Sequence, residues 1–547
     1  MVRAKQITSL EKVFKKNFEE YTEISEIRML RGERVSYQIV AEGDFSVGKL
    51  KYYGSAEKYA SVYIVDPAVL DMPVDFGNPY DDNYLTLEPA LMPDILVPAE
   101  DRDNTFCPAE FPRALWIDIE IPRDAKAGDY TFAVSASDPY YNNGDEIFFC
   151  EMKISVIDAE PLPTELIYTR WFHGDCIAEY HGIEVYSERH WELIDKHIRA
   201  AVHDGMNMIL TPIHTPPLDT APGSYRTPVH LVDIERRGGK YFFNFDKFDR
   251  FVKMAESAGI KYFEIAHLFS QGGAHTAANI LITENGEKKY AFDHNTPSDS
   301  KEYIDFLSEY LPAVVERTEV LGISERCFYH VSDEPRPRDI EVYKAAREAV
   351  VKHLKGAKTF DALTDYSYYE AGLVEYPVAS VDHIGAFLPH KIPTQFIYYS
   401  CAQQNGQINS FLSMPPARVR MLGVLLYKYK IKGFLQWGLN FYNSCMSLER
   451  INPYTTTSAD MRYQSGDPFI LYPSKNGAYT SIRGRLTHDA ISDLNLLRTA
   501  EKKIGYEAVT QIIDEVALSP LTFENYPKDK EFFFALRERL LNIVDGV

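Results

Sequence analysis

The sequence predicts a mixed α/β protein in which an N-terminal all-β sandwich precedes a closed (β/α)8 barrel. The 547 residues exceed what one hydrophobic core usually supports. Residues up to about 160 form short alternating runs typical of strands, whereas from 166 onward apolar runs alternate with helical segments. We therefore place the sandwich domain at 1–160 and the barrel, with a C-terminal helical extension, at 165–547.

The sandwich prediction rests on short runs of alternating apolar and polar residues that Gly, Pro, Asp and Asn clusters separate. These runs are RGERVSYQIVAEG, KYASVYIVD, RALWIDIEIPRDAKAGDYTFAVSA and EIFFCEMKISVID. In ALWIDIEIP the aliphatic side chains alternate with Trp116, Asp118 and Glu120, which predicts a strand with one buried face. The aliphatic members are Leu115, Ile117, Ile119 and Ile121. Two prolines in AEPLPTE, residues 159–165, indicate a linker.

The barrel prediction rests on eight apolar runs with helical segments between most of them. The runs are 166–172, 206–213, 260–269, 327–333, 357–363, 380–387, 394–401 and 432–439. Apolar spacings of three and four predict helices at 187–205, 246–259, 300–322, 339–356 and 416–430. The helical pattern is weakest in the fifth and sixth units.

Charge and composition narrow the classes of partner. The formal net charge of -21, from 58 basic and 79 acidic side chains, argues against nucleic acid. Six cysteines lack zinc-site spacing, so we expect free thiols and no metal site. No apolar run reaches the roughly 18 residues of a membrane span. Because the N-terminal stretch has no apolar signal region, we expect a cytoplasmic protein unless a leader has been removed.

Polar side chains follow each predicted barrel strand, at the end where such barrels hold their active sites. They are Arg170, Trp171, His173, Asp175, His214, His267, Gln271, Asp333, Glu334, Asp365, Tyr366, His383, Tyr398, Tyr399, Cys401, Gln403, Gln436, Trp437, Asn440 and Tyr442. Aromatic rings stack on sugars, while carboxylates and amides bind hydroxyls. A single residue of this kind is more often a packed core side chain, but their coincidence at one rim predicts a carbohydrate site.

Two adjacent acids, Asp333 and Glu334, end the predicted fourth strand in FYHVSDEP. Neighbouring strand residues point to opposite faces, so both acids meet one substrate only where the strand ends, which Pro335 helps to mark. Adjacent acids fit glycoside hydrolysis assisted by a 2-acetamido group of the substrate. Glu334 would then be the acid/base and Asp333 would orient the acetamido group. Locally, DEP also fits a helix start, with Asp as cap and Pro in the first turn.

The chain resembles glycoside hydrolase family 123, the β-N-acetylgalactosaminidases, and the wider DUF4091-domain proteins. The resemblance runs through RGERVSYQIVA, IPRDAKAGDYTFAVSA, YTRWFHGDCIAEY, VSDEP and the block IYYSCAQQNGQINSFLSMPPARVRMLGVLLYKYKIKGFLQWGLNFY. It implies removal of a terminal β-linked N-acetylgalactosamine from a glycan or glycoconjugate, with retention and without a cofactor. Asp333 would be the acetamido-stabilising residue and Glu334 the acid/base. We expect the sugar pocket to contain Trp171, His173, Asp175, His214, Tyr399, Trp437 and Asn440.

Two other functions remain open at this point. A catalytically silent barrel would bind glycans without hydrolysing them. A glycosidase of other specificity would use two separate carboxylates, pairing Glu334 with Asp175 or Asp365. The sequence leaves open the choice between N-acetylgalactosamine and N-acetylglucosamine, the aglycone and the oligomeric state.

Overall fold

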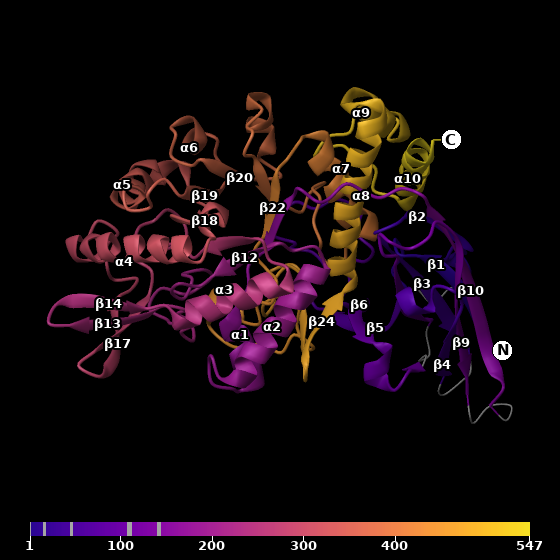
Figure 1. Ribbon diagram of the computed structural model, residues 1–547, viewed down its shortest axis with the longest axis horizontal. Coiled ribbons are helices and arrows are strands. Elements are labelled where there is room, and N and C mark those ends of the chain that lie inside the picture. The colour runs from indigo at the N-terminus through magenta and orange to yellow at the C-terminus, as the bar shows by residue number, and fades with distance from the viewer. Residues whose placement is uncertain (1, 15–17, 44–47, 107–111, 139–143, 547) are drawn as a thin grey trace.

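The computed structural model describes residues 2–14, 18–43, 48–106, 112–138 and 144–546 (Figure 1). An N-terminal all-β region lies beside a closed parallel barrel, as predicted. Five of the six cysteines lie in the described residues and are free thiols, as predicted, and Cys107 lies outside them. No helix in the described ranges is long and apolar enough to span a membrane.

The N-terminal region contains two sheets. Their strand orders are β1-β3-β8-β5-β6-β24-β23 and β2-β10-β9-β4-β7. The N-terminal strands are β1 (Arg3–Thr8), β2 (Glu26–Leu30), β3 (Arg34–Glu42), β4 (Gly48–Tyr53), β5 (Ala60–Leu70), β6 (Ala90–Pro98), β7 (Thr105–Phe106), β8 (Arg113–Glu120), β9 (Gly128–Ser137) and β10 (Glu146–Ile157). The predicted alternation of β8 holds, with Leu115, Ile117 and Ile119 in the sandwich core.

The opposite face of β8 is buried as well, which corrects the prediction of a single buried face. Trp116 packs into the large core shared with the barrel. Asp118 is 2% exposed and pairs with Arg485 of the C-terminal part of the chain, Oδ2 to Nε at 2.8 Å. Two strands from that part, β23 (Tyr472–Ser474) and β24 (Gly477–Ser481), also extend the first sheet, since β24 pairs antiparallel with β6. Strands that follow the barrel in the chain therefore complete one sheet of the sandwich, and the second face of β8 joins the core of the barrel.

Eight parallel strands close the barrel, and the last pairs with the first. They are β11 (Ile167–Arg170), β12 (Met208–Thr211), β15 (Tyr262–Ile265), β18 (Cys327–Tyr329), β19 (Lys358–Leu363), β20 (Tyr376–Ser380), β21 (Phe396–Tyr398) and β22 (Gly433–Gln436). The sixth predicted strand, 380–387, is wrong: β20 precedes it. Val381, Ile384 and Phe387 are buried at a spacing of three, which suits the 3-10 turn at Ile384–Ala386 rather than a strand.

Helices surround the barrel (Figure 1), and all but the two short ones at 174–181 and 367–370 lie where the sequence predicts them. They are α1 (Gly174–His181), α2 (Glu188–His203), α3 (Asp246–Ala258), α4 (Lys301–Val320), α5 (Ile340–Val351), α6 (Ser367–Glu370) and α7 (Pro416–Lys428). The helical extension comprises α8 (Ile482–Ile504), α9 (Tyr506–Val516) and α10 (Lys530–Asp545). Ser187 and Ser300 cap α2 and α4 by accepting a backbone N–H.

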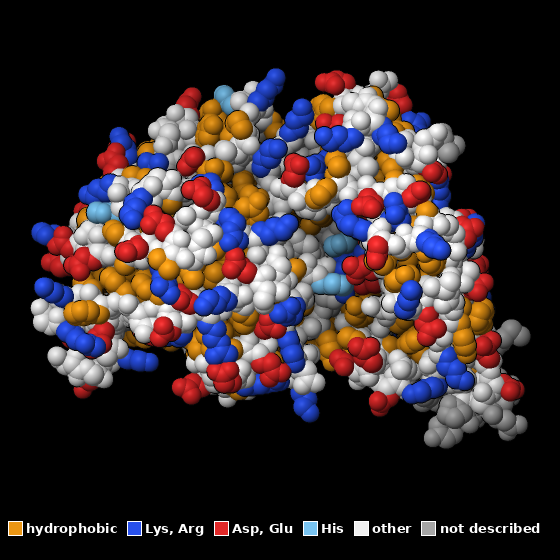
Figure 2. Space-filling model, in the orientation of Figure 1, with side chains coloured by type: hydrophobic (Ala, Val, Ile, Leu, Met, Phe, Trp, Pro, Cys, Tyr) orange, Lys and Arg blue, Asp and Glu red, His pale blue; other side chains and the backbone are white. Residues whose placement is uncertain are grey.

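The loops after the second and third strands carry a small additional sheet, which lies at the left of Figure 1. Its strands are β13 (Asp233–Arg237), β14 (Lys240–Asn244), β16 (Ile280–Glu284) and β17 (Glu287–Phe292). Figure 2 shows acidic and basic side chains interspersed over one face of the molecule.

Candidate active site

A cavity of about 100 Å³ lies at the C-terminal ends of the barrel strands. It is lined by Trp171, His173, Leu218, Asp219, Gln271, Asp333, Glu334, Ala362, Tyr398, Ser400, Cys401, Leu435, Trp437 and Tyr463. A larger cavity of about 480 Å³ lies between the sandwich and α10, and no strand-end residue of the barrel lines it. The smaller cavity is therefore the candidate active site.

Asp333 and Glu334 both line this cavity although they are neighbours in the chain. The strand β18 ends at Tyr329, so the two acids lie in the loop beyond it and escape the alternation of a strand. Glu334 has a φ of +40°, which is unusual for a residue with a side chain. This conformation turns the backbone between the acids and allows both carboxyl groups to face one ligand.

Each acid has its own hydrogen-bond donor. Gln271 Nε2 donates to Asp333 Oδ2 at 3.0 Å, and the Tyr398 hydroxyl donates to Glu334 Oε1. Burial raises the pKa of Asp333 well above its usual range, and the Glu334 charge raises it further. Burial also raises the pKa of Glu334, against the hydrogen bond from Tyr398. The pair therefore retains a proton at a pH where ordinary carboxyl groups have lost theirs.

A buried network lies next to the acids. His330 Nε2 is 2.6 Å from Glu264 Oε1, and His330 Nδ1 is 2.9 Å from Asp361 Oδ1. All three side chains are completely buried. Glu264 also accepts from Trp171 Nε1 at 2.5 Å, which ties the network to a wall of the cavity.

Comparison with known proteins identifies the family. The family description "Glycoside hydrolase 123, catalytic domain" matches residues 171–500. The chain belongs to glycoside hydrolase family 123. This family 123 hydrolase is thus an enzyme that acts on carbohydrate, as the sequence predicted.

Solved structures show how far the fold extends. A family 123 glycoside hydrolase from Clostridium perfringens, studied for glycolipid glycan hydrolysis, aligns over 100% of this chain and 98% of its own, with a TM-score of 0.73 and 16% identity. A family 10 xylanase from Thermobacillus composti aligns over 60% of this chain and 97% of its own, with a TM-score of 0.30 and 11% identity. A comparison with curated proteins gave no match. The first alignment shows that the family 123 hydrolase shares its fold with that enzyme across both regions.

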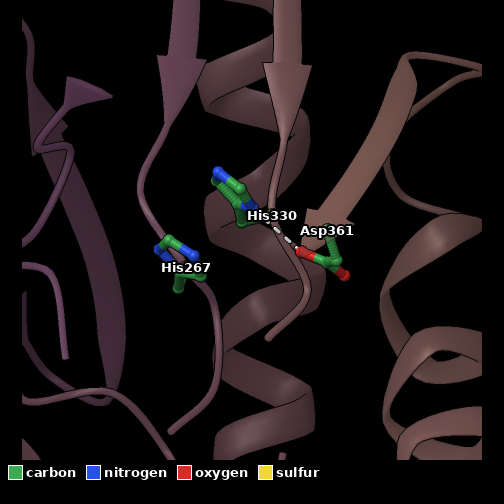
Figure 3. A group of neighbouring side chains, drawn as sticks. All are labelled: His267, His330 and Asp361. Atoms are coloured by element: carbon green, nitrogen blue, oxygen red, sulfur yellow. Dashed lines mark hydrogen bonds and ion pairs between the residues drawn. The ribbon is translucent and has the colours of Figure 1, made fainter. Parts of the chain in front are cut away.

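One group of side chains has the composition of a metal site. Ligand atoms of His267, His330 and Asp361 lie within 4.8 Å of one another (Figure 3). However, the rings of His267 and His330 stack with centroids 3.8 Å apart and planes 13° from parallel. Imidazole binds metals through lone pairs in the ring plane, so two stacked rings cannot both direct a lone pair at one ion. Both nitrogens of His330 also already contact carboxylates.

The structure places three of the seven predicted pocket residues on the cavity wall: Trp171, His173 and Trp437. The ring nitrogens of these side chains form hydrogen bonds with other protein groups. Trp437 Nε1 donates to Asp467 Oδ2 at 2.7 Å, and Arg226 donates to His173 Nδ1 at 3.0 Å. Burial, with the Arg226 charge, lowers the pKa of His173 to about 3, so this ring is neutral.

The other four predicted pocket residues do not line the cavity. Asp175 is 2% exposed and binds Arg226 through both oxygens, at 2.8 Å each. Asn440 accepts a hydrogen bond from the backbone N–H of His173 and donates one to its backbone C=O. It therefore holds the backbone of a residue that lines the cavity. His214 is buried and donates to the backbone oxygen of His267 at 2.8 Å.

Tyr399 is the fourth, and its neighbour Tyr398 lines the cavity instead. The two lie at the end of β21, where adjacent side chains point to opposite faces, so the prediction was displaced by one residue. Tyr399 is 1% exposed and belongs to the core around the barrel. Asp365, an alternative partner for Glu334, accepts hydrogen bonds from Ser367 and does not line the cavity either.

Sequence reasoning missed several wall residues. Gln271, Tyr398 and Cys401 were among the strand-end residues but not in the predicted pocket. Asp219 follows the second strand at the end of HTPPLD, and a turn rich in proline next to a strand end was the available signal. Tyr463 lies far along the loop after β22, where no local pattern indicates it, and its hydroxyl donates to Asp219 Oδ1 at 2.8 Å.

Proposed function

We propose that this family 123 hydrolase is a retaining exo-β-N-acetylgalactosaminidase that works by substrate-assisted catalysis. The observation that carries the proposal is the placement of Asp333 and Glu334 as neighbours on one cavity wall. A two-carboxylate glycosidase holds its acids about 5 to 9.5 Å apart on opposite sides of the scissile bond. Of the alternatives for such a partner, neither Asp175 nor Asp365 lines the cavity.

The chemistry follows from two carboxyl groups with different tasks. Ionised Asp333 would accept the acetamido N–H and stabilise the charge that develops as the acetamido oxygen attacks the anomeric carbon. Glu334 would give its proton to the leaving oxygen and later take one from the incoming water. Two successive displacements at the same carbon retain the configuration. The raised pKa of Glu334 suits a group that must hold a proton near neutral pH.

The wall residues fit a terminal sugar. Trp171, Trp437 and Tyr463 offer ring faces and edges, and Asp219, Ser400 and Gln271 offer hydrogen-bonding groups. Below the cavity the barrel is filled by Phe328, Phe360 and Phe396, each at most 2% exposed. A pocket closed from below suits removal of one residue from a chain end. We accordingly propose a β-N-acetylgalactosamine-terminated glycan or glycoconjugate as substrate.

Hydrolysis of aryl β-glycosides with and without a 2-acetamido group tests this function. We expect turnover of the N-acetylgalactosaminide only, and a loss of about 100-fold or more in kcat/KM for Glu334→Gln, because general-acid catalysis is worth that much. The matched control is Asp365→Asn, which removes an acid at the same rim outside the cavity and should retain wild-type turnover. Turnover of substrates that lack the acetamido group would contradict substrate assistance. Saturable sugar binding without turnover of any glycoside would favour the silent glycan-binding barrel.

A further inference from the structure

Asp333 presents a problem for the proposed chemistry. It is only 3% exposed and it lies beside Glu334, and both conditions favour its protonated form. The reaction requires the opposite distribution, with charge on Asp333 and the proton on Glu334. Some group must therefore favour negative charge at Asp333.

The contacts of His330 favour a positively charged ring. Ionised carboxylates only accept hydrogen bonds, so a ring whose two nitrogens both contact carboxylates must donate from both. Asp361 accepts hydrogen bonds at both carboxylate oxygens. The Tyr343 hydroxyl donates to Oδ2 at 2.5 Å, and the Val331 N–H donates to Oδ1 at 3.1 Å. Glu264 likewise accepts from the Thr169 hydroxyl at 2.7 Å and from the indole N–H of Trp171.

The groups that face His330 support this assignment. They are Glu264 from β15, Asp361 from β19, His267 from the segment after β15 and Asp333 from its own segment. Burial opposes the charge of His330, but the hydrogen bonds and charges of Asp361 and Glu264 outweigh it and raise its pKa to about 9. Burial, with the His330 charge, lowers the pKa of His267 well below its usual range, so the stacked neighbour is neutral.

The same network fixes the chain that carries the acids. Asp361 accepts the backbone N–H groups of Val331 and Ser332, the two residues before Asp333. The Ser332 hydroxyl donates to the backbone oxygen of Ser270, next to Gln271, which is the donor to Asp333. His330 thus lies within the framework that holds Asp333, where its charge lowers the pKa of that acid.

We propose that His330 is a buried imidazolium that keeps negative charge on Asp333 and thereby leaves the acidic proton on Glu334. It is a positioning residue, since it acts through Asp333 and lines no part of the cavity. The role in catalysis rests on the proposed function, whereas the charge of His330 does not. The two parts therefore need separate experiments.

Neutron diffraction of deuterated wild-type crystals near neutral pD tests the charge without any substitution or substrate. We expect deuterons on both Nδ1 and Nε2 of His330 and none on the facing oxygens of Glu264 and Asp361. A single deuteron on the ring, or one equivalent of a divalent metal bound between His267 and His330, would overturn the proposal. This outcome is independent of which glycoside the enzyme cleaves.

The pH profile of kcat/KM for the aryl β-N-acetylgalactosaminide tests the effect on Asp333. His330→Gln removes the cation, so the pKa of Asp333 should rise. The acidic limb of the profile should then move up by about one pH unit. At pH values below that limb, kcat/KM should be at least about tenfold lower than in the wild type. Tyr343→Phe is the matched control, because it removes a hydrogen bond from Asp361 and leaves the cation. It should lower the melting temperature while its acidic limb stays in place. An unshifted limb in His330→Gln would show a packing role only and would overturn the catalytic part.

Discussion

Glu334 occupies a backbone conformation that side chains rarely adopt, with φ at +40°. Such conformations cost about 1–3 kcal/mol each and persist where the surrounding structure imposes them. Two hydrogen bonds hold this conformation. The Tyr398 hydroxyl donates to the Glu334 carboxylate, and the Gly272 N–H donates to the backbone carbonyl of Asp333 at 2.8 Å. Two acids that repel each other are thus held on one wall, where a substrate can use both.

We expect the hydrogen bond from Tyr398 to set the alkaline limit of activity, because Glu334 is the proposed acid. This bond lowers the pKa of Glu334 within a site whose burial raises it. Tyr398→Phe removes the donor, so the pKa of Glu334 should rise and the acid should stay protonated to a higher pH. We expect the alkaline limb of the kcat profile to move upward by about half to one pH unit. A limb that stays in place or moves down would show that Glu334 is not the acid.

Only some residues of the site could be predicted from the sequence. The position of Asp333 and Glu334 at the cavity could be predicted because a strand end, a proline and two acids coincide in VSDEP. Whether Tyr398 or Tyr399 faces the cavity depends on which side chains of a three-residue strand point inward. A run this short has no periodicity that would show this in the sequence. The network around His330 joins Glu264 of β15 and Asp361 of β19 to the loop that follows β18, and only the closed barrel brings them together.

At the scale of elements, the contact between α7 and α8 is unusually close. A Cβ added to Gly423 of α7 would lie 1.8 Å from the backbone oxygen of Ala490 in α8. Gly423→Ala should therefore force the helices apart and lower the free energy of unfolding by about 1–3 kcal/mol. Urea denaturation measures this change. Gly385→Ala is the matched control, since its Cβ would meet nothing within 4 Å, and equal stability of the two variants would contradict the packing described.

Elements were predicted well where their periodicity was long and poorly where it was short. The predicted helix at 300–322 is observed as Lys301–Val320, despite an internal proline at Pro312. The sixth strand was misplaced because Pro377 argues against a strand at Tyr376–Ser380, while the following segment offers the buried apolar residues Val381, Ile384 and Phe387. Helices of the fifth and sixth units are short or replaced by 3-10 turns, as their weak pattern indicated.

For the whole molecule, the sandwich is an integral part of the structure rather than an appended domain. Residues after the barrel return to pair with β6, and Arg485 of α8 reaches back to Asp118 of β8 and to Asp204 after α2. No sequence pattern indicated this return, because pairing between Thr480 and Leu96 depends on tertiary packing across most of the chain. The polar face of β8 was for the same reason predicted to face solvent, whereas it anchors the barrel.

The enzyme as a whole is proposed to use its substrate's acetamido group as the nucleophile, and fluorination of that group measures this directly. Fluorine withdraws electrons and weakens the acetamido oxygen without enlarging the sugar much. The substrates are aryl β-N-acetylgalactosaminides with none, one, two or three fluorines on the acetyl methyl group. We predict that kcat/KM falls with each added fluorine, by about tenfold or more over the whole series. A tenfold fall corresponds to about 1.4 kcal/mol of lost transition-state stabilisation. A rate that is unchanged across the series would contradict the account, because a nucleophile supplied by the protein would not respond to the fluorines.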